Sequence, residues 1–338
     1  MRGTGTVATP RASRRAPSLS SCGVSPTSST DPVGGAVEGF VVILSLGAVG
    51  YVLAVRGVLD ETSQAVLSRL VYVVGTPALL ISLLSETDVS RVFGPWFLVA
   101  LGGVLATLVL YVPWALWRRR RTSHVIVGAL SASYANAGYL GLPIAAYVLG
   151  DAAYALPTMM LQLVFYAPLA LSMLEMAGRG RAGLNPFAFV RAGVRNPVSV
   201  AAVIGVTIAL TEIQLPLVVA EPIRLLGQLA VPCALIAFGV SLRFGPRIGI
   251  GQGGEVAFVA ALKLLWQPAI AYLVARFALG LPDTQVVGVT MMAALPTAQN
   301  VFVYASRFGR DHVLARDCVA VTTGLSLPVL IGLAALLG

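Results

Sequence analysis

YANAGYLGLP, residues 134–143, interrupts an apolar run with two glycines and a proline within six positions. Proline removes a backbone N–H and clashes with the preceding turn, and glycine lowers helix stability, so this stretch should open the helical hydrogen-bond ladder. The freed N–H groups and the following half-helix suit an anion. Asn136 adds a side-chain amide that both donates and accepts. We therefore predict a broken helix with a ligand site at Asn136, Gly138, Gly141 and Pro143.

The composition indicates that this break lies inside a membrane. The chain has 338 residues, of which 57% are hydrophobic and 11% are charged. A soluble domain carries ~25% charged residues, so this chain predicts an all-α polytopic membrane protein whose surface faces the lipid bilayer. The net charge of +9 does not indicate a nucleic-acid partner, because the arginines lie in short clusters between apolar runs.

Apolar segments of membrane-spanning length recur ten times along the chain. A helix that crosses a hydrocarbon core of ~30 Å needs ~20 residues. Residues 1–33 lack an apolar run, so we expect a disordered tail there, or alternatively sequence that lies upstream of the true start codon. The predicted spans are 36–56, 65–85, 95–117, 124–148, 153–176, 197–213, 220–242, 254–278, 284–306 and 312–337.

The loops between these spans differ strongly in arginine content. One alternate set of loops carries 14 arginines, and the opposite set carries at most 3. The positive-inside rule places the first set, including the basic loop 177–196, in the cytoplasm. We therefore predict a multi-pass protein of the cell membrane with both termini outside the cytoplasm.

Proline spacing suggests an internal duplication. Pro77 in PALLI and Pro232 in PCALI are 155 residues apart, and Pro113 and Pro268 are separated by the same distance. Two units of five helices have opposite orientations in the membrane, because five is odd. The pattern thus predicts two inverted five-helix repeats, residues 36–176 and 197–338, which is an architecture typical of secondary transporters.

The ninth span contains a second break, LPTAQN at residues 295–300. Here, too, a proline lies beside amide and hydroxyl side chains. We predict that the fourth and ninth helices are discontinuous and cross each other around a substrate near the midplane. Close packing of small residues against a neighbouring helix is the alternative interpretation. The candidate ligand residues of this second break are Pro296, Thr297, Gln299 and Asn300.

Two polar side chains in other spans are further candidates. Lys263 lies in the middle of the eighth span, where a cation costs at least ~2.5 kcal/mol and normally faces a cavity or a partner. It could attract an anionic substrate or form an ion pair, or it could bond to helix carbonyls for packing alone. Gln162 in the apolar fifth span could line the cavity or bond to another helix. Glu255 and Asp317, near span ends, are weak candidates for a proton relay.

Several strings in this order resemble the auxin efflux carrier family, the bacterial permeases related to the plant PIN exporters. Besides YANAGYLGLP, the resemblance rests on RNPVSVAAVIG at 195–205 and LAVPCALIAFGVSL at 229–242. It rests also on LKLLWQP at 262–268 and AALPTAQNVFVYASRFG at 293–309. The similarity covers residues 36–338.

The resemblance implies ten helices in two inverted repeats, with the fourth and ninth crossing at their breaks. Asn136 and Pro143 match the family's first crossover, and Pro296 matches the second, with Thr297 and Asn300 beside it. Family substrates are small organic acids, including auxin, malonate and malate, and homodimers are expected. No cofactor is implied. Alternating access at the crossover would make the protein a secondary-active permease of a mono- or dicarboxylate.

Other functions predict features that can be compared with this sequence. A relative of the sodium-coupled bile-acid symporters is the alternative within transport. A membrane sensor or scaffold is the alternative outside it, although the longest loop between spans has only about 20 residues. The sequence has no GxSxG or HExxH motif and no paired intramembrane aspartates, so we do not expect an enzyme.

Overall fold

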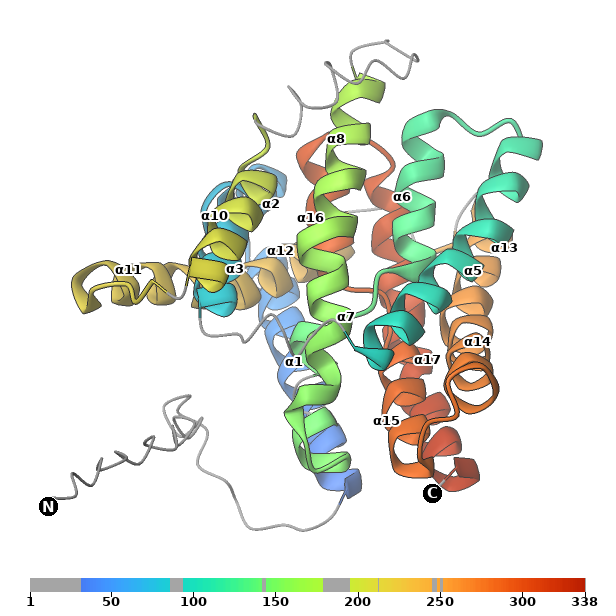
Figure 1. Ribbon diagram of the computed structural model, residues 1–338. Helices are drawn as coiled ribbons and strands as arrows, with labels where there is room; N and C mark the ends of the chain where they lie inside the picture. Colours follow the sequence, from blue (N-terminus) through green and yellow to red (C-terminus); the bar gives the residue numbers. More distant parts are fainter. Residues whose placement is uncertain are drawn as a thin grey trace, which may run out of the picture. The chain divides into compact units, whose positions relative to one another are not determined.

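A computed structural model describes residues 32–85, 94–141, 144–178, 195–211, 213–244, 248–249 and 252–337. The predicted tail, most of the predicted basic loop and Pro143 lie outside these residues. Within them, the regular secondary structure is helical throughout (Figure 1). The all-α class predicted from composition is therefore confirmed.

The first half of the chain forms these helices: α1 Pro32–Val55, α2 Glu61–Leu70, η1 Val71–Gly75, α3 Thr76–Ser85, α5 Pro95–Trp117, α6 Thr122–Ser133, η2 Ala137–Gly141, η3 Ile144–Val148, η4 Ala152–Ala155, α7 Leu156–Met160, η5 Leu161–Tyr166 and α8 Ala167–Gly178. The second half forms these: α10 Pro197–Thr211, α11 Leu217–Gln228, α12 Ala230–Phe244, α13 Gly253–Ala261, η6 Leu262–Trp266, α14 Gln267–Leu273, η7 Val274–Ala278, α15 Asp283–Ala293, α16 Gln299–Arg307 and α17 His312–Leu337.

Six helical stretches in the described residues are long and apolar enough to cross a membrane. The other four predicted spans coincide with α1, with the short helix α10, and with the two interrupted segments α6–η3 and α15–α16. A helical membrane protein is thus supported. The long apolar stretches are Glu61–Ser85, Pro95–Trp117, Ala153–Ala177, Leu217–Phe244, Gly253–Ala278 and His312–Leu337.

Glycines allow very close helix contacts between α1 and α12. A Cβ atom added to Gly239 would lie 1.9 Å from the carbonyl oxygen of Gly47, and one added to Gly50 would lie 2.2 Å from that of Ile236. Lipid offers no hydrophobic driving force for helix association, so membrane helices depend on such close packing. In the same part of the fold, α3 packs against α10 and α11, and α12 packs against α2 and α11.

Wide π-helical turns precede prolines in three of the long helices. η1, η5 and η6 each end two residues before a proline, namely Pro77, Pro168 and Pro268. A proline in a helix lacks the N–H and crowds the carbonyl four residues earlier, so the preceding turn widens instead of breaking. Two of these turns, η5 and η6, contain the polar candidates Gln162 and Lys263.

Candidate functional site

The fourth predicted span is interrupted at Tyr134–Asn136. Helix α6 ends at Ser133, Tyr134 takes an extended conformation with φ −86° and ψ 103°, and the π-helical turn η2 begins at Ala137. The described interruption thus precedes the glycines that predicted it. Gly138 and Gly141 lie in η2, whereas the position of Pro143 is outside the described residues.

The ninth predicted span is interrupted at residues 294–298. Helix α15 ends at Ala293, and α16 begins at Gln299 after an extended N-cap residue, Ala298. Pro296 lies inside this interruption. Because its ring cannot continue the α15 ladder, the chain leaves the helix and re-enters it only after Ala298.

The two interruptions are hydrogen-bonded to each other. The N–H of Asn136 donates to the carbonyl of Pro296 over 2.8 Å, and the N–H of Ala298 donates to the carbonyl of Tyr134 over 3.1 Å. Ala135 and Thr297 face each other in a one-residue antiparallel bridge between these bonds. Each broken segment therefore satisfies backbone groups that the other exposes, as non-helical backbone in a membrane requires.

Candidate side chains from both breaks strengthen this pairing. The amide nitrogen Nδ2 of Asn136 donates to Oε1 of Gln299 over 2.9 Å, and both residues are buried. The hydroxyl of Thr297 donates to the carbonyl of Ser131 over 2.6 Å, while its N–H donates to the hydroxyl of Thr322 over 3.1 Å. Asn136, Thr297 and Gln299 are thus brought together.

Gln162 binds the backbone of the first break. With the amide oriented to match donors with acceptors, its oxygen accepts from the N–H of Ala135 over 2.7 Å. Its nitrogen donates to the carbonyl of the same residue over 2.9 Å. The side chain is buried in the π-turn η5, so it replaces the helical partners that Ala135 lacks.

Lys263 lies near the C-terminal ends of α6 and α15. Its Nζ atom donates to Oε1 of Gln267 and to the carbonyl of Ala293, both over 2.8 Å, and the residue is 0% exposed. Gln267 in turn donates to the carbonyl of Ser133 over 3.3 Å. The lysine therefore bonds to carbonyl oxygens, which is one of the two interpretations that the sequence left open.

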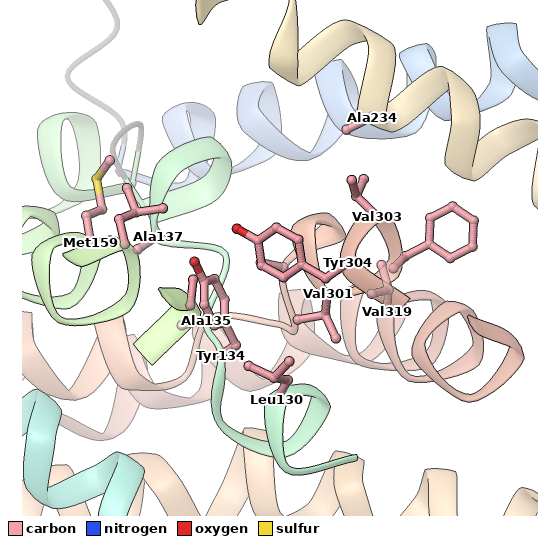
Figure 2. Close-up of a cluster of buried hydrophobic side chains, with 14 of the residues drawn as sticks. Leu130, Tyr134, Ala135, Ala137, Met159, Ala234, Val301, Val303, Tyr304 and Val319 are labelled. Carbon is pink, nitrogen blue, oxygen red and sulfur yellow. The ribbon is translucent and has the colours of Figure 1, made fainter. Parts of the chain in front are cut away.

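A small cavity opens beside the paired breaks. Its volume is about 30 Å³, which holds about one water molecule. Figure 2 shows buried hydrophobic side chains of this region: Met159 lies by Ala137, and Tyr134 lies by Tyr304. The ring centroids of the two tyrosines are 6.3 Å apart in an edge-to-face arrangement. The lining residues are Leu79, Tyr134, Ala135, Asn136, Gly138, Met159, Gln162, Leu163, Ala298 and Asn300.

The two candidate glycines have different surroundings. A Cβ on Gly141 would lie 2.9 Å from Cδ1 of Leu295, so this glycine lets the second break approach η2. A Cβ on Gly138 would meet only the methyl group of Met159, at 3.8 Å, and would project beside the cavity. Asn300, at the start of α16, lines the cavity, and its Oδ1 atom is buried without a hydrogen-bond partner.

The sequence analysis did not predict Gln267 and Met159 as residues of the site. Gln267 links Lys263 to the end of α6, and Met159 forms one wall of the cavity. The position of Gln267 four residues after Lys263, on the same helix face, was an available signal. Nothing in the local sequence distinguishes Met159 from other apolar residues of its span.

A second polar cluster lies at the opposite end of α6 from the break. Oε1 of Glu255 accepts from Tyr111 over 2.7 Å and lies 2.9 Å from Nε2 of His124, and Oε2 accepts from Arg120 over 2.5 Å. Nδ1 of His124 lies 2.8 Å from Oδ1 of Asp311. Glu255 is thus placed in an ion network that joins α5, α6, α13 and the α16–α17 loop.

Comparison with known proteins shows similarity to one transporter family. Residues 36–333 match the model of a family described as membrane transport protein. A protein of Rhizobium meliloti (strain 1021), provisionally named a malonate transporter, is 28% identical over 84% of this chain and 90% of its own length. An uncharacterized transporter of Methanothermobacter thermautotrophicus is 28% identical over 87% and 95%, respectively. Auxin efflux carrier component 1 of Arabidopsis thaliana is 28% identical over 40% of this chain and 22% of its own.

Proposed function

The chain belongs to the membrane transport protein family, which includes the auxin efflux carriers, and on this premise we propose that it moves a small organic anion across the membrane. The observation that carries the proposal is the pair of chain breaks that bond to each other beside a small cavity, which is mostly apolar but includes three amide side chains. In secondary transporters, substrate sites are formed where broken helices meet, and here amide side chains lie at that crossing.

The cavity suits a carboxylate better than a cation. Helix α16 begins beside it, and a helix N-terminus carries about half a positive charge. The amides of Asn136, Gln162 and Asn300 line it as well. The nitrogens of Asn136 and Gln162 already donate to Gln299 and Ala135, and Oδ1 of Asn300 is an acceptor, so a carboxylate would be bound by the Asn300 amide turned to present its N–H groups. No carboxylate side chain is among the residues that line this cavity.

A mono- or dicarboxylate is the proposed substrate class. The similarity to the Rhizobium meliloti protein whose name refers to malonate supports this class. A three-carbon diacid needs more room than one water site, so loading requires side chains to move. We expect Met159 to move first, because its unbranched thioether side chain adapts readily to new shapes.

The proposed architecture is ten spans in two inverted repeats that alternate access to the crossing. The matching proline intervals, Pro77 to Pro232 and Pro113 to Pro268, support it. We also propose a homodimer in the cell membrane with both termini outside the cytoplasm. Cysteine accessibility at the two chain ends, measured in intact cells, would test the orientation.

Uptake into liposomes tests the function directly. Purified protein would be reconstituted and assayed with radiolabelled malonate, malate and indole-3-acetate, with and without sodium and proton gradients. We expect uptake of at least one acid and its loss in Asn136→Ala. Gln64→Ala, which removes an amide that donates to Ser68 within α2, is the matched control and should retain uptake. Absence of uptake for every acid by folded protein would contradict the proposal and favour a sensor or scaffold.

A further inference from the structure

The loop between α5 and α6 carries a row of arginines directly after a helix of membrane-spanning length. The apolar stretch Pro95–Trp117 is long enough to cross a membrane, so the residues that follow it should lie at the level of the lipid headgroups. Trp117 is 77% exposed, and tryptophan favours this level of a bilayer. The next four residues, Arg118–Arg121, are all arginine. A basic cluster thus follows an interfacial tryptophan at the end of a span.

One arginine of this row is bound inside the fold, and the other three are exposed. Arg120 donates to Oε2 of the buried Glu255 over 2.5 Å, which fixes the loop against α13. Within the described residues, Arg118, Arg119 and Arg121 are exposed and form no ion pair with a carboxylate. The fold therefore anchors the loop through one guanidinium group and leaves three outside.

The acidic side chains near this loop already have partners. Glu255 accepts hydrogen bonds from Arg120 and Tyr111. Asp311 accepts from the hydroxyl of Ser123 over 3.0 Å, and its Oδ1 atom lies 2.8 Å from Nδ1 of His124. Both carboxylates are thus engaged with the interior side of the loop and with the first turn of α6. The exposed side of the loop remains positively charged.

Arg119 has a backbone conformation that favours glycine. Its φ is 54°, and it comes directly after the C-cap of α5. Its N–H donates to the carbonyl of Leu116 over 2.9 Å, and the N–H of Arg120 donates to that of Ala115 over 3.0 Å, which is the Schellman pattern of helix termination. Glycine is the usual residue at this position because it has no Cβ. Arg119 therefore adds a charge to the loop where glycine would suit the backbone better.

We propose that the loop between α5 and α6 binds the headgroup of an anionic phospholipid. The exposed guanidinium groups of Arg118, Arg119 and Arg121 donate to its phosphate oxygens, for which the planar fork of arginine is well suited. Cζ of Arg118 lies 5.9 Å from the ring centroid of Trp114, a cation–π contact that supports this side chain at the helix end. A lipid is the occupant because the cluster directly follows a span and its exposed Trp117, where phosphate groups of the bilayer lie.

Fluorescence quenching by brominated lipids tests this proposal in vesicles. The full chain would be reconstituted in phosphatidylcholine with increasing fractions of phosphatidylglycerol, with bromine on the acyl chains of one lipid at a time. The difference between wild type and Trp117→Phe gives the signal of Trp117. Each arginine near an anionic headgroup contributes roughly fivefold in affinity, so we expect phosphatidylglycerol to bind beside Trp117 at least about tenfold more tightly than phosphatidylcholine. Equal binding of the two lipids would overturn the proposal.

Arg119→Gly separates the charge from the stability of the fold. Glycine suits the left-handed backbone, so this variant should melt no lower than the wild type in detergent, whereas its preference for phosphatidylglycerol should fall by roughly fivefold. With Arg118→Gln and Arg121→Gln added, the two lipids should bind about equally. Arg276→Gln, which removes an arginine that pairs with Asp283 at the end of another span, is the matched control and should keep the wild-type preference. An unchanged preference in the triple variant would refute the proposal.

Inorganic phosphate distinguishes a lipid headgroup from a soluble anion. When phosphate replaces chloride at constant ionic strength, we expect the lipid preference to change by less than about twofold, because the acyl chains hold the headgroup at the loop. Loss of the preference in phosphate would show that the loop binds a soluble anion and would contradict the proposal. The quenching measurement requires no transport, so it decides the lipid site even if the protein takes up no organic acid.

Discussion

Thr297→Val should weaken the joint between the two chain breaks without changing its shape. The hydroxyl of Thr297 donates to the carbonyl of Ser131 over 2.6 Å, and both residues are fully buried. That carbonyl has no helical partner, because the N–H four residues later belongs to Ala135, which lies in the break and faces Gln162. Valine therefore leaves a buried acceptor without a donor.

A buried acceptor that loses its donor costs about 1–3 kcal/mol. This range corresponds to roughly 5–150-fold in an equilibrium constant. We expect the unfolding free energy of Thr297→Val, measured by detergent titration with tryptophan fluorescence, to fall by that amount. Thr297→Ser keeps the hydroxyl and should recover most of the loss.

Thr207→Val is a matched control for this prediction. The Thr207 hydroxyl also donates to a helix carbonyl, that of Val203, over 2.8 Å, but its side chain is exposed on α10. This carbonyl lies within a continuous helix, so the substitution should cost less than about 0.5 kcal/mol. Equal losses for Thr207→Val and Thr297→Val would refute the reasoning that the broken helices depend on the threonine at the joint.

Three further changes have distinct expected outcomes. Gln162→Leu removes both bonds to Ala135, so we expect a loss of about 2–4 kcal/mol in the same titration and reduced uptake; unchanged values would mean that Gln162 only fills space. Gly239→Ala places a Cβ 1.9 Å from a backbone oxygen of α1, so size-exclusion chromatography should show little folded protein, whereas Gly324→Ala, with open space at its Cβ, should elute normally. Burial raises the pKa of the Asp311 carboxyl, but hydrogen bonds from His124 and Ser123 outweigh it and hold that pKa below its usual 3.8. The Asp311 carboxylate thus stabilises the fold fully above pH 3.8, and this effect is lost as the pH falls through its lower folded pKa. Wild type should therefore melt above Asp311→Asn at pH 6, and the difference should shrink steadily as the pH is lowered into the acid range. A constant difference would contradict this.

The helical class and the existence of two breaks could be predicted from local sequence. Apolar length and the low charged fraction determine the class, and the Gly and Pro clusters mark the two interruptions. The position of the first break could not be predicted in the same way. It falls at Tyr134–Asn136 because partners distant in sequence, Pro296, Ala298 and Gln162, supply the hydrogen bonds that make a gap tolerable there.

The surroundings of Lys263 illustrate the same limit of local patterns. Its burial in mid-span predicts a compensating partner, but the sequence does not distinguish a carboxylate from a helix end. The structure shows helix ends, because two helices stop beside the η6 turn. A polar residue one turn later, Gln267, completes the contact.

The bridge between Ala135 and Thr297 also has a consequence for biosynthesis. The first break is synthesised more than 150 residues before its partner, and at ~5–20 residues per second the ribosome needs roughly 10–30 s to reach the second. During that interval the N–H of Asn136 and the carbonyl of Tyr134 lack the hydrogen-bond partners that Pro296 and Ala298 later supply. The nascent half must therefore be shielded by the insertion machinery or by water, and premature termination before α16 would leave a product that quality-control proteases can recognise.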